Sequence, residues 1–164
     1  MTESEAELLG LLRALDDPGW LEWPQDCDRG GIAARFGTLV ARLEGDFATR
    51  CTVEPDTQDS SEYGRVTVPG EVTVCGTRIV VCVSKFGSLA LVCADNPGAF
   101  LGTDEAQAEG ELDCADLARV DRALAELGYV VVREELLESD YDGPSRLPSH
   151  VQRPSWWNRF FGYF

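Results

Sequence analysis

The sequence predicts an α+β fold: a single domain with one mainly antiparallel sheet of five or six strands, two N-terminal helices, one helix before the last strand and a short aromatic C-terminal helix. Apolar residues recur at three- and four-residue spacing toward both ends of the chain, which is typical of helices. Short apolar or alternating runs between turn residues occupy the middle, which is typical of strands. A length of 164 residues suits one domain over 1–164, with 1–5 frayed and 143–154 a linker to the tail.

Two helices come first in the predicted order. Thr2 or Ser4 caps the first helix, whose leucines form an apolar stripe as far as residue 15, and an Asp-Pro-Gly sequence at 17–19 ends it. The second helix is predicted over 32–43, after a pair of glycines, because its apolar residues lie three and four positions apart.

The strands follow the second helix. They are predicted over 49–54, 65–68, 72–74, 78–83 and 89–94. The polar stretch 55–62 is predicted to be a mobile loop. The runs 78–83 and 89–94 are almost continuously apolar, so they are expected to be adjacent central strands joined by a hairpin loop over 84–88.

Helices and one strand complete the order. The acidic segment 102–110 is predicted to be exposed. Asp113 is expected to cap a helix over 114–127 that Gly128 ends, and a strand follows over 129–133. A helical turn is expected over 134–138. Ser155 is expected to cap a last short helix, with Trp157, Phe160, Phe161 and Phe164 at i, i+3, i+4 and i+7.

The charge of the chain limits its partners. The net charge is −15, which disfavours the two polyanions, nucleic acid and anionic membrane, and favours a basic partner or solubility alone. The acidic N-terminus has no apolar segment of a secretory signal, and no apolar run approaches 18 residues. A cytoplasmic protein without membrane contact is therefore predicted.

Catalytic and metal-binding motifs are weak in this sequence. The only histidine, His150, stands alone beside the tail, so no catalytic residue is predicted. None of the six cysteines forms a C-x-x-C pair, and they are expected to be reduced, mostly buried thiols. The segment 138–143 looks like the start of a calcium loop, but Ser149 stands where a bidentate Glu is needed. The glycine pair at 30–31 has aspartates beside it and builds no phosphate cradle. No cofactor and no metal are expected.

A dense run of acids is the candidate partner-binding surface. Residues 95–142 hold 14 acids against three arginines. Repulsion among such charges would be relieved by a basic partner, which they would also attract from a distance. The alternative is a solvated helix face. The candidate residues are Asp104, Glu105, Glu109, Glu111, Asp113, Asp116 and Asp121.

The C-terminal tail is the second candidate. Its last nine residues hold six of the chain's 15 aromatic residues and no acid. We expect it to dock on the domain and close the core, with Arg153 and Arg159 on the rim. The alternatives are a partner anchor and, less favoured because of the acidic body, membrane insertion. The candidate docking residues are Trp156, Trp157, Phe160, Phe161 and Phe164.

These features favour a non-catalytic protein-binding module. In its general build, a small acidic α+β domain without a catalytic motif, the chain is similar to the immunity proteins of bacterial toxin systems, and inhibition of a toxin or other basic protein by a monomer or weak dimer is predicted. One alternative is a dimeric module like a secretion chaperone, which the oligomeric state would distinguish. Another is an enzyme that uses clustered carboxylates, which a pocket lined by acids from several elements would favour.

Overall fold

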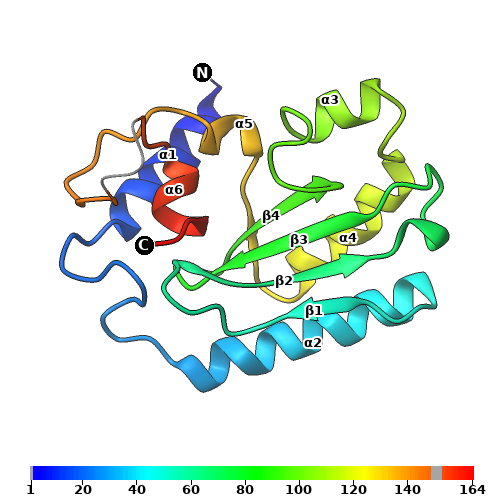
Figure 1. Cartoon of the computed structure of the whole chain (residues 1–164), viewed down its shortest axis with the longest axis horizontal. Helices are drawn as coiled ribbons and strands as arrows, with labels where there is room; N and C mark the ends of the chain where they lie inside the picture. The colour runs from blue at the N-terminus through cyan, green and yellow to red at the C-terminus, as the bar shows by residue number, and fades with distance from the viewer. Residues whose placement is uncertain (1, 149–152) are drawn as a thin grey trace.

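The computed structural model describes residues 2–148 and 153–164, and it confirms the predicted α+β class. Within this part of the chain the sheet has five strands in the order β1-β2-β3-β4-β5. The first three pairings are antiparallel and β5 runs parallel to β4. The strands, shown in Figure 1, are β1 (Thr52–Glu54), β2 (Glu62–Val68), β3 (Ile79–Ser84), β4 (Leu89–Ala94) and β5 (Val130–Val131).

The two most apolar strands occupy the interior of the sheet, as predicted. β3 and β4 are neighbours with β2 and β5 outside them, and every residue of both strands is buried. The turn between them contains Gly87, whose φ of +57° favours glycine. A Cβ at this position would also overlap the side chain of Leu15, so the hairpin turn needs glycine for two reasons.

One face of the sheet is covered by α2 (Arg29–Phe47) and α4 (Cys114–Glu126), which contact each other. Each helix begins at an aspartate cap: Asp28 Oδ1 accepts from the Gly31 amide at 2.9 Å, and Asp113 Oδ2 accepts from two amides of α4. Because Asp28 is the cap, α2 starts earlier than the predicted residue 32.

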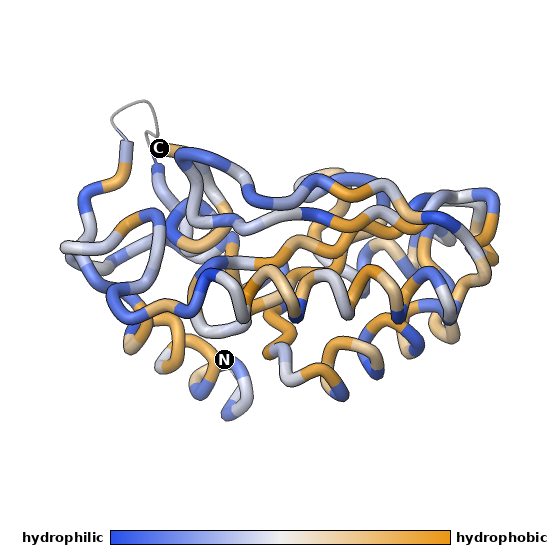
Figure 2. The backbone as a smooth tube through the Cα atoms, turned by 90° about the horizontal axis from the view of Figure 1, so that it is seen from below, coloured by the Kyte–Doolittle hydropathy of each residue, from blue (hydrophilic) through white to orange (hydrophobic). Residues whose placement is uncertain are grey.

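The other face carries a second apolar cluster made by α1 (Glu3–Leu15), α5 (Glu134–Leu137) and α6 (Trp156–Phe161). Figure 1 shows α1 and α6 side by side at one end of the molecule, with the C-terminus beside them. In Figure 2 the strands and helices carry most of the hydrophobic positions, and the outer loops are hydrophilic. Thr2 and Glu5 form a capping box at the start of α1.

One predicted strand is absent, and two other segments differ in detail from the prediction. The segment 72–74 is not a strand, because a 3-10 turn over Gly70–Val72 leads into it and Asp116 Oδ2 accepts from its Val74 amide at 2.8 Å. The acids of the segment 102–110 are exposed, as predicted, and the segment also contains a helix that was not predicted, α3 (Thr103–Ala108). Residues 55–61 form a loop, as predicted, but Ser60 and Ser61 at its end are fully buried, because the chain's C-terminus packs on them.

Other predictions concern the cysteines and the linker. The six cysteines are free thiols, but only Cys82 and Cys93 are buried and Cys114 is exposed. The predicted linker is tied to the fold at Ser145, whose hydroxyl bonds to Asp16 Oδ1 at 2.5 Å. His150 and Ser149 lie outside the described residues.

Candidate functional site

Three of the predicted partner-binding acids form hydrogen bonds within the domain. Asp113 caps α4, and Asp116 is only 4% exposed because it holds the Val74 amide. The half-buried Glu111 bonds to the hydroxyl of Thr77. These carboxylates already have partners inside the molecule, so they contribute charge but are poorly placed to contact another protein.

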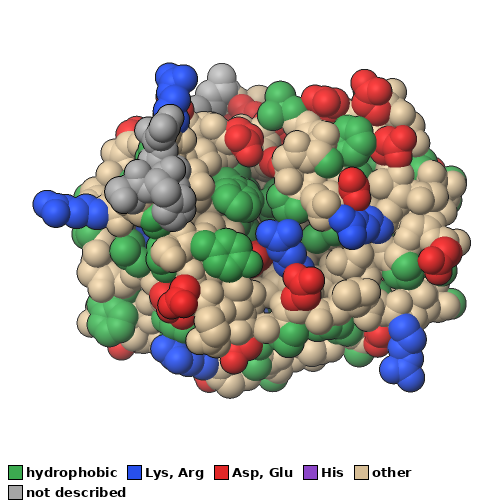
Figure 3. Space-filling view, in the orientation of Figure 1, with side chains coloured by type: hydrophobic (Ala, Val, Ile, Leu, Met, Phe, Trp, Pro, Cys, Tyr) green, Lys and Arg blue, Asp and Glu red, His purple; other side chains and the backbone are tan. Residues whose placement is uncertain are grey.

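Three others, Asp104, Glu105 and Glu109, are exposed on and just after α3, and we call them the α3 patch. Asp104 is 3.4 Å from Arg133, with both side chains mostly exposed, so this pair is weak. Within the described chain, Glu105 and Glu109 form no ion pair. Figure 3 shows acidic side chains gathered at the upper right, where Figure 1 places α3. The α3 patch is therefore the part of the predicted surface that is open to a partner.

The seventh acid, Asp121, lines a cavity of about 380 Å³ that we call the acidic cavity. Asp104 of α3, Asp121 of α4 and Glu134 of α5 converge there with Arg133. Burial raises the pKa of Asp121, and Arg133 partly offsets this. Within 2–148 and 153–164, no group of three or more His, Cys, Asp or Glu side chains is arranged to hold a metal ion.

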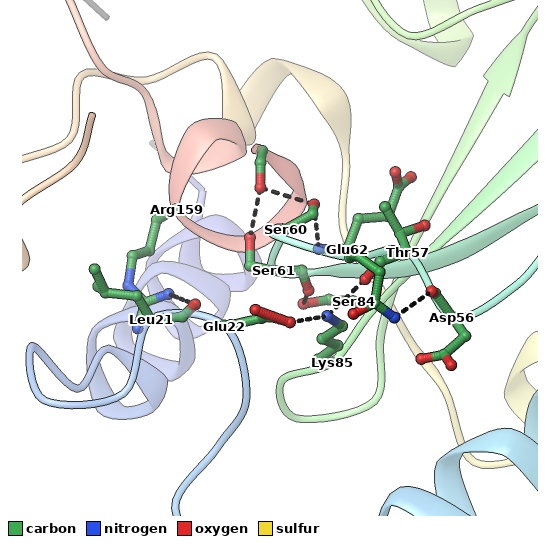
Figure 4. Close-up of polar contacts among 12 residues, drawn as sticks. Leu21, Glu22, Asp56, Thr57, Ser60, Ser61, Glu62, Ser84, Lys85 and Arg159 are labelled. Atoms are coloured by element: carbon green, nitrogen blue, oxygen red, sulfur yellow. Dashed lines mark hydrogen bonds and ion pairs between the residues drawn. The ribbon is translucent and has the colours of Figure 1, made fainter. Parts of the chain in front are cut away.

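The tail packs on the domain. Trp156, Phe160 and Phe161 are at most 1% exposed, whereas Trp157 and Phe164 are half-buried. The carbonyl oxygen of Gly162, just beyond α6, accepts from the Ser60 hydroxyl at 2.8 Å and from the Ser61 amide at 3.1 Å. Figure 4 shows these serines directly beneath the turn of α6. The tail is thereby joined to the segment that leads into β2.

Arg159 does not stand on the rim as predicted. Its side chain is fully buried, and its Nε lies 2.7 Å from Asp16 Oδ1. Its other nitrogens donate to three backbone carbonyls, those of Asp17, Leu21 and Trp20. The guanidinium thus provides hydrogen bonds to Asp16 at the end of α1 and to backbone carbonyl groups in the loop after it. Of the two arginines predicted on the rim, Arg153 is the one that is exposed.

Lys85 was missed as a site residue, although it is the only lysine in the chain. Its side chain is fully buried, and Nζ lies 3.1 Å from Glu22 Oε2, 2.8 Å from the Thr57 carbonyl oxygen and 4.4 Å from the centre of the Trp23 ring. Figure 4 shows the ammonium between Glu22 and Thr57. Burial lowers the pKa of Lys85, and the Glu22 carboxylate partly restores it.

Lys85 also borders a second cavity, of about 280 Å³, which we call the α2 cavity. It lies between the start of α2, the β3–β4 turn and the residue before β5. Its polar lining residues include Asp28, Arg35, Ser84, Ser88 and Tyr129. The sequence offered one signal for it, the glycine pair at the start of α2, and the neighbouring aspartates obscured that signal.

No family model matches this sequence, and neither a curated protein nor a solved structure is significantly similar to it. Among the described residues there is no helix with the length and apolar character needed to cross a membrane.

Proposed function

We propose that the chain is a non-catalytic acidic module that binds a basic protein, in the manner of an immunity-type inhibitor of a toxin. The observation that carries this proposal is the α3 patch, in which Glu105 and Glu109 are exposed and have no cation partner in the described structure. In the described structure as a whole, ion pairs engage only eight of the chain's 29 carboxylates. Much of the negative charge is therefore available to an outside partner.

The form of this surface supports association steered by charge. A field of one sign raises the rate at which an oppositely charged protein is encountered, and it disfavours nucleic acid and anionic lipid. The α3 helix has no basic residue. Because the side chains of Glu105 and Glu109 make no hydrogen bond or ion pair in the described structure, their charges can be changed with little effect on folding.

Co-expression tests the proposal. Each reading frame that flanks the gene of this chain is expressed with it, and the growth of the host measures the neutralisation of a toxic product. The native chain should restore growth, and the double variant Glu105→Lys, Glu109→Lys should slow association with the toxic product at low salt by about tenfold or more.

The matched control is Glu3→Lys, Glu7→Lys, which changes the net charge equally on the exposed side of α1. It should retain most of the association rate. Equal losses in both double variants would show that net charge acts without the α3 patch. The absence of a toxic or chain-binding product among the flanking reading frames would overturn the proposal.

The acidic cavity favours a second candidate function, an enzyme that uses carboxylates. Asp104, Asp121 and Glu134 come from three different helices and converge there. Burial raises the pKa of Asp121 and of Glu134, which favours the protonated form that a general acid uses. Stoichiometry separates the two candidates, because an inhibitor neutralises its target at equimolar amounts. Neutralisation by much less than one equivalent, abolished by Asp121→Asn, would favour the enzyme.

A further inference from the structure

The α2 cavity has apolar walls and a few polar groups, which is the usual composition of a small-molecule site. Pro24, Cys27, Ile32 and Val83 contribute apolar surface. Its volume of about 280 Å³ suits a compact molecule. This cavity is separate from the α3 patch and from the acidic cavity, so its occupant is independent of the proposed function.

Tyr129 lines this cavity, and its hydroxyl has no hydrogen-bond partner in the described structure. Tyr129 is 7% exposed, and its Oη is buried without a hydrogen bond to any described residue. Burial raises its pKa to about 12, so the phenol is neutral near pH 7 and can both donate and accept. A buried hydroxyl without a partner destabilises the protein, and a ligand atom would remove that cost.

The charges around the cavity select the kind of ligand. Lys85 is already neutralised by Glu22, and the Asp28 carboxylate caps α2. Arg35 has no carboxylate partner in the described structure; it donates to Ser88 Oγ, and its Cζ lies 5.7 Å from the centre of the Tyr129 ring. One unneutralised guanidinium with Asp28 nearby suits an anion of single charge, and a planar guanidinium matches a carboxylate.

We propose that the α2 cavity binds a small monocarboxylate with a compact apolar body. The carboxylate is held by Arg35, the Tyr129 hydroxyl donates a hydrogen bond to the ligand, and the apolar walls contact its body. A doubly charged group is disfavoured by Asp28.

Titration of the full chain with acetate, 3-methylbutanoate and benzoate, followed by backbone-amide NMR, tests the proposal. Either 3-methylbutanoate or benzoate, or both, should change the backbone-amide chemical shifts of Gly31, Ser88 and Tyr129. Acetate should bind more weakly. The neutral amide of the best ligand should bind at least about tenfold more weakly, because it lacks the charge that Arg35 holds. Arg35→Gln should weaken binding similarly. The matched control, Arg50→Gln, removes a different exposed arginine and should leave the affinity unchanged.

Tyr129→Phe provides the sharper test. It should raise the thermal midpoint of the ligand-free protein, because the unpartnered hydroxyl is removed. It should also lower the affinity for the carboxylate that binds best. A lower midpoint would show that the hydroxyl already has a partner, which overturns the proposal. The proposal also fails if none of the three carboxylates shifts these amides, or if the neutral amide binds as tightly as its carboxylate.

Discussion

Glu134 carries a carboxylate into the protein interior without a cation in the described structure to neutralise it. It is 4% exposed; its Oε1 accepts from the Gly98 amide at 2.7 Å, and its Oε2 lies 3.8 Å from Cys93 Sγ. Burial raises its pKa above the ordinary value of 4.5, and the Gly98 amide opposes the shift. The folded protein therefore holds the proton of Glu134 to a higher pH than the unfolded chain does.

This shift predicts how stability depends on pH. The stability that comes from a protonated Glu134 is fully present below the unfolded pKa and is lost as the pH rises through the folded pKa. In urea unfolding, Glu134→Gln should therefore be more stable than the native chain at pH 8, and the difference should shrink toward pH 4. The control Glu7→Gln removes an exposed acid from α1 and should show a much smaller difference. A Glu134→Gln variant that is less stable than the native chain at pH 8 would contradict this account.

For single residues, the sequence predicted helix caps well but did not predict the burial of a charged side chain. Asp113 and Ser155 were predicted as caps, and Thr2 was one of two candidates for a third, because a cap depends on residues within the same turn. Arg159 was placed on the rim because its partner Asp16 lies 143 positions away in the sequence. A charged residue is rarely buried unless it is paired, and sequence alone does not show that pairing.

At the scale of elements, predictions succeeded where the periodic pattern was long and buried. β3 and β4 are continuous apolar runs, and α4 has a complete stripe between an aspartate cap and a glycine. The alternation at 72–74 was too short to determine a strand. The amide of Val74 donates its hydrogen bond to the Asp116 carboxylate and not to a neighbouring strand. The acidic cavity and the α2 cavity could not be predicted, because each joins segments that meet only in the folded chain.

The helix α6 is predicted to be essential for stability. Truncating a buried aromatic residue such as Phe160 costs about 3–5 kcal/mol, and a domain is stable by only about 5–15 kcal/mol. Deletion of 155–164 removes three buried aromatic rings and leaves Asp16 buried without Arg159, so the truncated chain should unfold or aggregate.

Thermal melts check this prediction in graded steps. Phe160→Ala should lower the midpoint strongly, whereas Tyr163→Ala, at a position 55% exposed, should change stability by no more than about 0.5 kcal/mol. A soluble deletion variant with an unchanged midpoint would show instead that the tail serves a partner.

At the scale of the whole molecule, charge and fold oppose each other. The sheet buries an apolar cluster on each face, and this burial stabilises the compact state. The net charge of −15 is held on that compact body, and its self-repulsion destabilises it. A basic partner that covered the α3 patch would relieve part of this repulsion, so binding and stability are coupled.

The coupling predicts that salt alone should stabilise the free protein. Raising NaCl from about 0.01 to about 0.15 M shortens the screening length from about 30 to about 8 Å, which weakens repulsion between separated carboxylates. The thermal midpoint should rise over this range. Glu105→Gln, Glu109→Gln should raise the midpoint at low salt and flatten its dependence on salt, because two unpaired charges are gone. The opposite control, Arg50→Gln, Arg122→Gln, removes two exposed arginines and should steepen it. A midpoint that is constant or falls with salt would mean that the acids are already neutralised within the fold, and the α3 patch would then offer a basic partner little gain.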